Sequence, residues 1–380
     1  MFRIKSDKII LEDAIVSGYV YYEGSSIVSV TDEEREVEKE YDMTGLYVSP
    51  GFIDLHTHGA NGYGFIGTED DVINACNIHL KHGTTSIFPT LPAAPIEKMT
   101  NGVKAVQSAM KNPRAQSNIM GAHLEGPYLS LQQLGAQSGS FFVPLVEEEY
   151  KKLIETYGDT IVRWTYAPEI DTEGKFCKYL SEHNIVSSAG HTDAIYDDML
   201  VAMENGCHLI THLYSCTSTI TRDHGFRRLG VIETAMLHDD MYVEIIADGK
   251  HLPKELVQLI LKIKGSDKVA LVTDSSDFAG SNITHGYAQE REFIIEDGVC
   301  KLSDRSAFAG SIAMADNLIR FIAGEVGVPM AEAVKMLTKV PAEIMGLNKG
   351  SLSQGMDADI IVFNDDIEIQ KVFVMGREII

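Results

Sequence analysis

Eight short apolar runs, rich in β-branched residues, recur through the middle of the 380-residue chain. Most are separated by stretches with helical periodicity, such as EDDVINACNIHLKHG and PKELVQLILKIKG. Buried parallel strands are near-continuous apolar runs, and their alternation with helices is typical of βαβ units. Eight units therefore predict an α/β fold of the (β/α)8 barrel type, with a helical pair over residues 317–346 after the eighth run. The runs are GFIDLHTHG, TTSIFPT, IMGAHLEGP, IVRWTYAPE, IVSSAGH, HLITHLY, YVEIIADGKH and VALVTDSS.

The two ends of the chain have a different pattern. Apolar and polar residues alternate there, with Gly18 and Gly24 as turn signals near the N-terminus. This alternation predicts short antiparallel strands. Because chain termini often lie close together, we expect residues 1–50 and 348–380 to form one small β-sandwich domain. Residues 51–347 would then form the catalytic barrel domain.

Ionisable residues gather at the carboxyl ends of six of the eight runs, which is where barrels of this type carry their active sites. His56 and His58 lie two positions apart, so both can point to the same side of a strand and bind one ion. Buried ionisable groups are costly unless they are paired or bound to metal, and the set therefore predicts a metal site. The ionisable residues at these six ends are His56, His58, His123, Glu125, His191, His212, Asp248, His251 and Asp274.

The ligand types restrict the metal and suggest the chemistry. Imidazole and carboxylate without thiolate suit zinc, iron, nickel or manganese rather than magnesium or calcium. We expect one or two divalent ions, with zinc as the first choice. Such an ion lowers the pKa of bound water from about 15.7 towards 7. A carboxylate outside the ligand set can take the water proton and pass it to a leaving group, and Asp274 is the candidate.

Composition excludes several partners. The chain has 32 Lys plus Arg against 55 Asp plus Glu, a net charge of −23, which argues against nucleic acid and anionic lipid. The five cysteines include no C-x-x-C pair, as expected of free thiols in a reducing compartment. Lys8, Glu12 and Asp13 interrupt any apolar core of signal-peptide length. We therefore expect a cytoplasmic protein that acts on a small molecule.

Seven motifs resemble those of a known family. PGFIDLHTHG, HLEGPYL, AGHTDA, THLYS, ADGKH, VTD and FAGS occur in the order and spacing of the amidohydrolase superfamily. The chain is most similar to its N-acetylglucosamine-6-phosphate deacetylase branch, for which HLEGP together with GHTDA is specific. The resemblance spans nearly the whole chain. It implies hydrolysis of an amino-sugar phosphate amide to acetate and the free amine.

The resemblance also implies roles for the ionisable residues. Glu125, His191 and His212 would hold the principal metal, and His56 and His58 would complete a second site bridged by Glu125. Asp274 would be the general base and then the general acid. His123 would be a packing or supporting residue of the HLEGP strand. His251 would contact the substrate, in this family often across a dimer interface, so we expect a homodimer.

The substrate pocket departs from the family pattern. Gln137 stands where the branch usually has histidine, and Ser215 replaces the asparagine that helps to hold the phosphate. Arg222 matches the phosphate-binding arginine if one residue is deleted before it, with Arg227 and Arg228 just beyond. A guanidinium fork suits phosphate, although these arginines could instead pair with surplus carboxylates. The residues expected to bind substrate are Ala136, Gln137, Ser215, Cys216, Arg222, His251, Phe308, Ala309 and Gly310.

These departures leave two alternatives to an amino-sugar phosphate deacetylase. The first is a hydrolase of an unphosphorylated or galactosamine-type N-acyl sugar, or of another small N-acyl compound. The second is a barrel that has lost catalysis and serves as a binding protein. All five expected ligands and Asp274 are present, which favours an enzyme.

Overall fold

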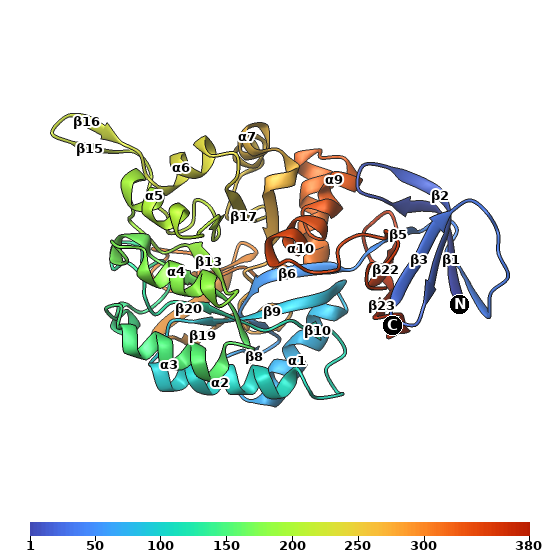
Figure 1. Cartoon of the computed structure of the whole chain (residues 1–380), viewed down its shortest axis with the longest axis horizontal. Helices are drawn as coiled ribbons and strands as arrows, with labels where there is room; N and C mark the ends of the chain where they lie inside the picture. The colour runs from blue at the N-terminus through green and yellow to red at the C-terminus, as the bar shows by residue number, and fades with distance from the viewer.

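A computed structural model describes residues 1–380 and has a near-closed parallel barrel at its centre (Figure 1). Each of the eight apolar runs contributes one strand, and the strands pair in chain order around the barrel, so the predicted fold is confirmed. A two-residue strand, β10 (Asn118–Ile119), pairs in addition with β9. The barrel strands are β6 (Phe52–Thr57), β9 (Thr84–Pro92), β11 (Ala122–Glu125), β12 (Ile161–Tyr166), β13 (Val186–Ala189), β14 (Leu209–Ile210), β17 (Tyr242–Ile246) and β18 (Val269–Val272).

The barrel is closed between its last and first strands by backbone hydrogen bonds beyond the end of β18. The amide of Asp274 donates to the carbonyl of His56 at 2.8 Å, and the amide of His58 donates to the carbonyl of Ser275 at 2.8 Å. These bonds join three residues that were expected to be functional. Closure of the barrel therefore fixes the relative position of the two segments that carry them.

Helices cover the outside of the barrel and bury an apolar layer against the strands (Figure 1). The predicted helical pair over residues 317–346 is instead four consecutive helical segments, and Gly327 and Pro329 lie in the break between the second and the third. No helix combines the length and the apolarity needed to span a bilayer. The helices are α1 (Glu69–Leu80), α2 (Ile96–Ala109), α3 (Glu147–Tyr157), α4 (Lys175–Glu182), α5 (Tyr196–Glu204), α6 (Val231–Leu237), α7 (Lys254–Lys264), α8 (Ala315–Ile319), η4 (Arg320–Val326, a π-helix), α9 (Met330–Lys335) and α10 (Lys339–Met345), with short 3₁₀ turns η1 (Gly139–Phe141), η2 (Pro168–Ile170) and η3 (Ser266–Lys268).

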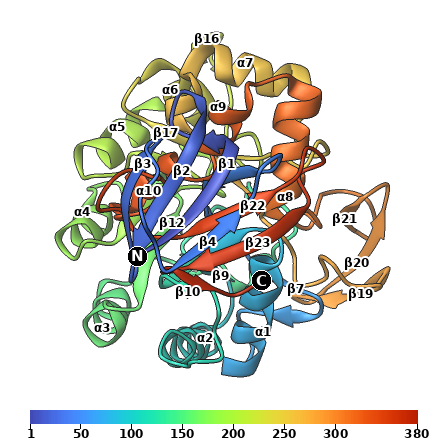
Figure 2. The same ribbon diagram turned by 90° about the vertical axis from the view of Figure 1, so that its right-hand side faces the viewer.

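Strands from both ends of the chain form one eight-stranded sheet beside the barrel (Figures 1 and 2). The two ends meet where β22 lies antiparallel to β5, with Ile360 opposite Pro50. The sheet is mixed rather than purely antiparallel, because β4 and β5 run parallel to β1. The division of the chain into two domains stays a prediction. The strands are β1 (Phe2–Ile10), β2 (Ile15–Glu23), β3 (Ser26–Thr31), β4 (Lys39–Asp42), β5 (Tyr47–Pro50), β22 (Ile360–Phe363), β23 (Ile369–Val374) and β24 (Arg377–Glu378).

The two glycines that were expected to mark turns have different roles. Gly24 lies in the β2–β3 turn with a φ of 57°, as predicted. Gly18 lies inside β2 with a φ of 153°, and a Cβ atom there would meet the carbonyl oxygen of Thr31 at 2.6 Å. Gly18 therefore permits a close approach of β2 and β3 rather than a turn.

Three small β units interrupt the barrel sequence and were not predicted. The largest, here called the insert, is a three-stranded antiparallel sheet between β18 and α8, which lies at the edge of the molecule in Figure 2. A two-stranded hairpin lies between β14 and α6, and a shorter one follows β6. The insert contains β19 (His285–Ala288), β20 (Arg291–Glu296) and β21 (Val299–Leu302), and the hairpins contain β15 (Thr221–Asp223) with β16 (Phe226–Arg228) and β7 (Gly59–Ala60) with β8 (Tyr63–Gly64).

Candidate active site

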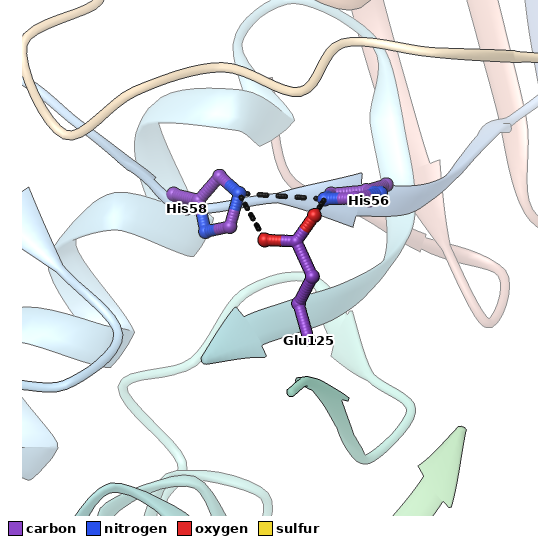
Figure 3. Close-up of side chains that lie close together, drawn as sticks. All are labelled: His56, His58 and Glu125. Carbon is purple, nitrogen blue, oxygen red and sulfur yellow. Dashed lines mark hydrogen bonds and ion pairs between the residues drawn. The ribbon is translucent and has the colours of Figure 1, made fainter. Parts of the chain in front are cut away.

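Glu125, at the end of β11, is the centre of the polar cluster at the carboxyl end of the barrel. Its Oε1 atom lies 2.9 Å from Nε2 of His212, 3.2 Å from Nε2 of His191 and 3.5 Å from Nε2 of His56. Its Oε2 atom lies 3.5 Å from Nε2 of His58 (Figure 3). Two groups of three residues thus share one carboxylate, and the ligand atoms within each group lie within 4.8 Å of one another.

Asp274 also contacts the pair formed by His56 and His58. Its Oδ1 atom lies 3.1 Å from Nε2 of His58 and 3.5 Å from Nε2 of His56. The two Nε2 atoms of the pair lie only 3.3 Å apart (Figure 3). Asp274 is buried but lines the cavity above the cluster, so its carboxylate can reach both a bound ion and a substrate.

The protonation of the histidines suits metal binding. Nδ1 of His58, His191 and His212 each contacts a backbone carbonyl oxygen, at distances of 3.2, 2.8 and 3.0 Å. A carbonyl oxygen only accepts hydrogen bonds, so Nδ1 carries a proton and Nε2 is the atom that faces the cluster, where it can exchange its own proton for an ion. Imidazole nitrogens and carboxylate oxygens that converge in this way fit a divalent cation.

The electrostatic environment also favours positive charge at this place. Burial lowers the pKa of His58, but its hydrogen bond to Asp274 and the nearby Glu125 outweigh that effect and raise the pKa to about 9. Burial raises the pKa of Asp274, but His56 and His58 lower it to about 2. The site therefore stabilises a cation, which a bound metal would supply in place of a proton.

Backbone conformation distinguishes three of these residues. His191, His212 and Asp274 have positive φ angles of 46°, 29° and 44°. Each lies two positions beyond the end of its strand, β13, β14 or β18. Non-glycine residues in this conformation cost about 1–3 kcal/mol each and concentrate at functional sites. The turn redirects each side chain from the barrel wall into the cluster.

Beneath the cluster, the barrel interior holds a polar network. Arg163 of β12 and Glu244 of β17 form a fully buried ion pair, and Arg163 also donates to the carbonyl of Leu55 at 3.1 Å. Oε2 of Glu244 lies 3.6 Å from Nδ1 of His56. His123 lies outside the ligand cluster, between the hydroxyls of Thr90 and Thr165. This network supports the ligand residues from below.

A cavity of about 890 Å³ opens above the cluster. Gln137 is placed closest to the ligands, because its Nε2 donates to Oε2 of Glu125 at 2.8 Å while its Oε1 accepts from the amide of Ala93 at 3.0 Å. His251 lines the cavity of its own chain and contacts Asp248 through Nδ1 at 2.8 Å. Eight of the nine residues expected to bind substrate line this cavity: Ala136, Gln137, Ser215, Cys216, His251, Phe308, Ala309 and Gly310.

The ninth, Arg222, does not line the cavity of its own chain, and its expected contact with the phosphate stays a prediction. Arg222 lies in β15, opposite Arg227 in β16, and the hairpin extends away from the barrel (Figure 1). Arg228 forms an ion pair with Asp223 in the same hairpin. The basic cluster expected beside His212 is therefore on an exposed arm.

Sequence reasoning missed the insert, whose residues form one wall of the cavity. Tyr287, Arg291 and Phe293 are among the insert residues that line it. A signal was present in REFIIEDGVCKL, because an Asp-Gly pair between alternating apolar residues indicates a two-residue hairpin. Asp297 and Gly298 form that turn, with φ angles of 55° and 77°.

Comparisons with known proteins agree with this architecture. A family model described as "Amidohydrolase family" matches residues 47–379. The N-acetylglucosamine-6-phosphate deacetylase of Haemophilus influenzae is 30% identical over 362 residues, which cover 92% of each chain. The enzyme of the same name from Bacillus subtilis is 28% identical, with 98% of this chain and 96% of the relative covered.

Solved structures of deacetylases also superpose on this chain over nearly its whole length. The crystal structure of N-acetylglucosamine-6-phosphate deacetylase from Pasteurella multocida superposes with a TM-score of 0.92 at 27% identity, covering 100% of this chain and 99% of the other. The structure of the Thermotoga maritima enzyme of the same name superposes with a TM-score of 0.88 at 27% identity, covering 99% of both chains. Similarity extends over the barrel and the sheet beside it.

Proposed function

The chain belongs to the amidohydrolase family, and we propose that it is a metal-dependent deacetylase of N-acetylglucosamine-6-phosphate. The products are acetate and glucosamine-6-phosphate. The observation that carries this proposal is the convergence of four histidine nitrogens on Glu125, with Asp274 beside them at the floor of a cavity. The similarity to deacetylases over nearly the whole chain supports the same reaction and substrate.

Five residues are proposed to hold one or two divalent ions, with zinc as the first choice because the donors are imidazole and carboxylate. When bound, such an ion supplies Lewis-acid chemistry, which acidifies water and polarises a carbonyl oxygen. Glu125 belongs to both groups of ligands, so it would serve an ion held by either group. The proposed ligands are His56, His58, Glu125, His191 and His212.

Asp274 is proposed to move the proton. Its low pKa keeps the carboxylate ionised at neutral pH, so it can accept a proton from the attacking water. It then delivers that proton to the amide nitrogen as the carbon–nitrogen bond breaks, which lets the amine leave. Nε2 of His58, a proposed ligand atom, lies 3.1 Å from its Oδ1 atom, so the carboxylate stands directly beside the place proposed for the ion.

The substrate proposal is tested by comparing kcat/KM for N-acetylglucosamine-6-phosphate, N-acetylglucosamine and N-acetylgalactosamine-6-phosphate, with acetate as the measured product. We expect the first compound to be preferred by at least roughly tenfold over each of the others. Gln137 and Ser215 favour the alternative of an unphosphorylated or different N-acyl sugar, because both differ from the family pattern. Equal or higher kcat/KM for the unphosphorylated sugar would establish that alternative.

We also propose a homodimer in the cytoplasm. The arm that carries β15 and β16 supports the dimer, because it leaves Ile220 and Phe226 exposed, Phe226 to 79%. Such apolar side chains on a projecting hairpin suit a contact with a second copy. Light scattering after size exclusion tests this assembly. The five cysteines are unpaired, which supports a reducing compartment.

A further inference from the structure

One proposed ligand histidine has no partner for its second ring nitrogen. Nδ1 of His56 is fully buried and makes no hydrogen bond. Nδ1 of His58, His191 and His212, in contrast, each contacts a backbone carbonyl oxygen. An unpaired polar atom in a protein interior is costly, so the group that faces it deserves an explanation.

The carboxylate of Glu244 is the group on this side of the ring. Its Oε2 atom lies 3.6 Å from Nδ1 of His56 and accepts a long hydrogen bond from the amide of His212 at 3.4 Å. Its Oε1 atom pairs with the guanidinium of Arg163. Because a carboxylate oxygen has two lone pairs, Oε2 can accept a further hydrogen bond.

Arg163 holds Glu244 in this position. Besides the ion pair, its guanidinium donates to the carbonyl of Leu55 at 3.1 Å and to the hydroxyl of Thr211 at 3.0 Å. Leu55 and Thr211 each directly precede a proposed ligand histidine in the chain. The buried pair is therefore hydrogen-bonded to the two segments that carry these ligands, which fixes the carboxylate relative to them.

We propose that Glu244 is a positioning residue, which accepts a hydrogen bond from Nδ1 of His56 when an ion is bound at Nε2. The ion concerned, here called the second ion, is that of the group formed by His56, His58 and Glu125. This inference rests on the proposed function, because it presupposes metal binding. A carboxylate acceptor fixes the tautomer and the orientation of a ligand histidine and makes its imidazole more basic. Glu244 therefore controls whether the second ion is held.

The test measures the number of zinc ions per chain and the affinity for each, by competition with a chelating dye. Arg163→Met/Glu244→Met removes both charges at similar volume, so no unpaired charge stays buried. It also removes the acceptor, and the second ion should bind roughly 10- to 100-fold more weakly. Arg163→Met/Glu244→Gln lacks the ion pair as well but keeps an acceptor oxygen, and should recover most of that affinity.

A second variant covers the case in which the double methionine protein does not fold. Glu244→Asp keeps the charge beside Arg163 but shortens the side chain by one methylene, which withdraws the oxygen from Nδ1 of His56. It should also weaken the binding of the second ion. Unchanged affinity for the second ion in Glu244→Asp would overturn the inference.

The matched control is Asp359→Asn. Asp359 is also buried and pairs with the buried Lys349 at 2.7 Å, but it contacts none of the proposed metal ligands. Lys349 keeps a second partner in Asp357, at 2.7 Å. We expect Asp359→Asn to bind both ions with wild-type affinity, even if its midpoint of thermal unfolding falls.

The outcomes separate this inference from the proposed function. Wild-type affinity for the second ion in the double methionine protein overturns the role of Glu244. Equal weakening in the methionine and glutamine proteins, or in Asp359→Asn, also overturns it, because either result indicates a general loss of stability. A wild-type chain that binds a single zinc ion overturns the inference alone. A wild-type chain that binds no metal overturns the proposed function, and the inference with it.

Discussion

At the scale of single residues, Glu125 and Asp274 differ in their contacts and therefore in their proposed roles. Glu125 contacts four histidines, whereas Asp274 contacts only His56 and His58 at the end of β6. The first is thus suited to holding ions and the second to moving a proton. Substitutions at the two positions should therefore have different consequences.

Replacement of Asp274 tests the proton transfer. Asn is nearly isosteric with Asp but cannot accept a proton, so Asp274→Asn should lower kcat by about 10²- to 10⁴-fold. The ligand histidines and Glu125 remain, and metal content measured by mass spectrometry should stay within error of wild type. A variant that keeps wild-type kcat would exclude Asp274 as the base.

Replacement of His58 tests the second metal group. His58 belongs only to the group with His56 and Glu125, whereas Glu125 also serves His191 and His212. His58→Gln should therefore reduce bound zinc from two ions to one per chain after reconstitution. The opposite result, complete loss of metal, would show that the two groups are not independent.

His79 gives a prediction about pH and stability. It is fully buried, and its Nε2 donates to the carbonyl of Gly59 at 2.9 Å. Burial lowers its pKa from 6.5 to about 4, so between these values the unfolded chain binds the extra proton. The free energy of unfolding should therefore be highest above pH 6.5. It should decrease by up to roughly 3 kcal/mol as the pH falls towards 4.

The measurement compares thermal unfolding of wild type and His79→Gln between pH 7 and pH 4.5. The glutamine amide can make the same donation to Gly59, but it does not titrate. The difference in stability between the two proteins should narrow as the pH falls, while loss of metal affects both alike. A constant difference would mean that His79 is not the titrating group.

At the scale of elements, the terminal sheet depends on the close contact at Gly18. Alanine there would combine an unfavourable φ with a clash against Thr31, and Gly18→Ala should cost about 3 kcal/mol. Gly24→Ala is the control, because Gly24 also has a positive φ but open space around it, and should cost only about 1 kcal/mol. Equal midpoints of urea unfolding for Gly18→Ala and Gly24→Ala would argue against the proposed importance of the contact between Gly18 and Thr31.

How far the elements could be predicted follows from how local their signals are. The barrel strands and the ligands at their ends follow from apolar runs and from the i, i+2 alternation of His56 and His58. The insert had a local signal in Asp297-Gly298 that was overlooked, and Arg291 was missed with it. The direction of the β15–β16 hairpin has no local signal, because it depends on how the whole arm leaves the barrel.

At the scale of the whole molecule, an acidic chain encloses a site that favours cations. The net charge of −23 comes from the chain as a whole, and Glu125 and Asp274 add negative charge at the cavity floor. Bound metal would offset that negative charge where an anionic sugar must enter. The account therefore requires metal for substrate binding as well as for catalysis.

The most direct test of the account is acetate release from N-acetylglucosamine-6-phosphate by the purified full-length chain, before and after removal of metal. We predict turnover by the zinc-loaded protein, loss of at least about 100-fold after chelation, and recovery when zinc is restored. The Asp274→Asn protein, loaded with zinc in the same way, should remain slow. Acetate release that survives complete removal of metal, or no acetate release from the zinc-loaded chain, would contradict the account.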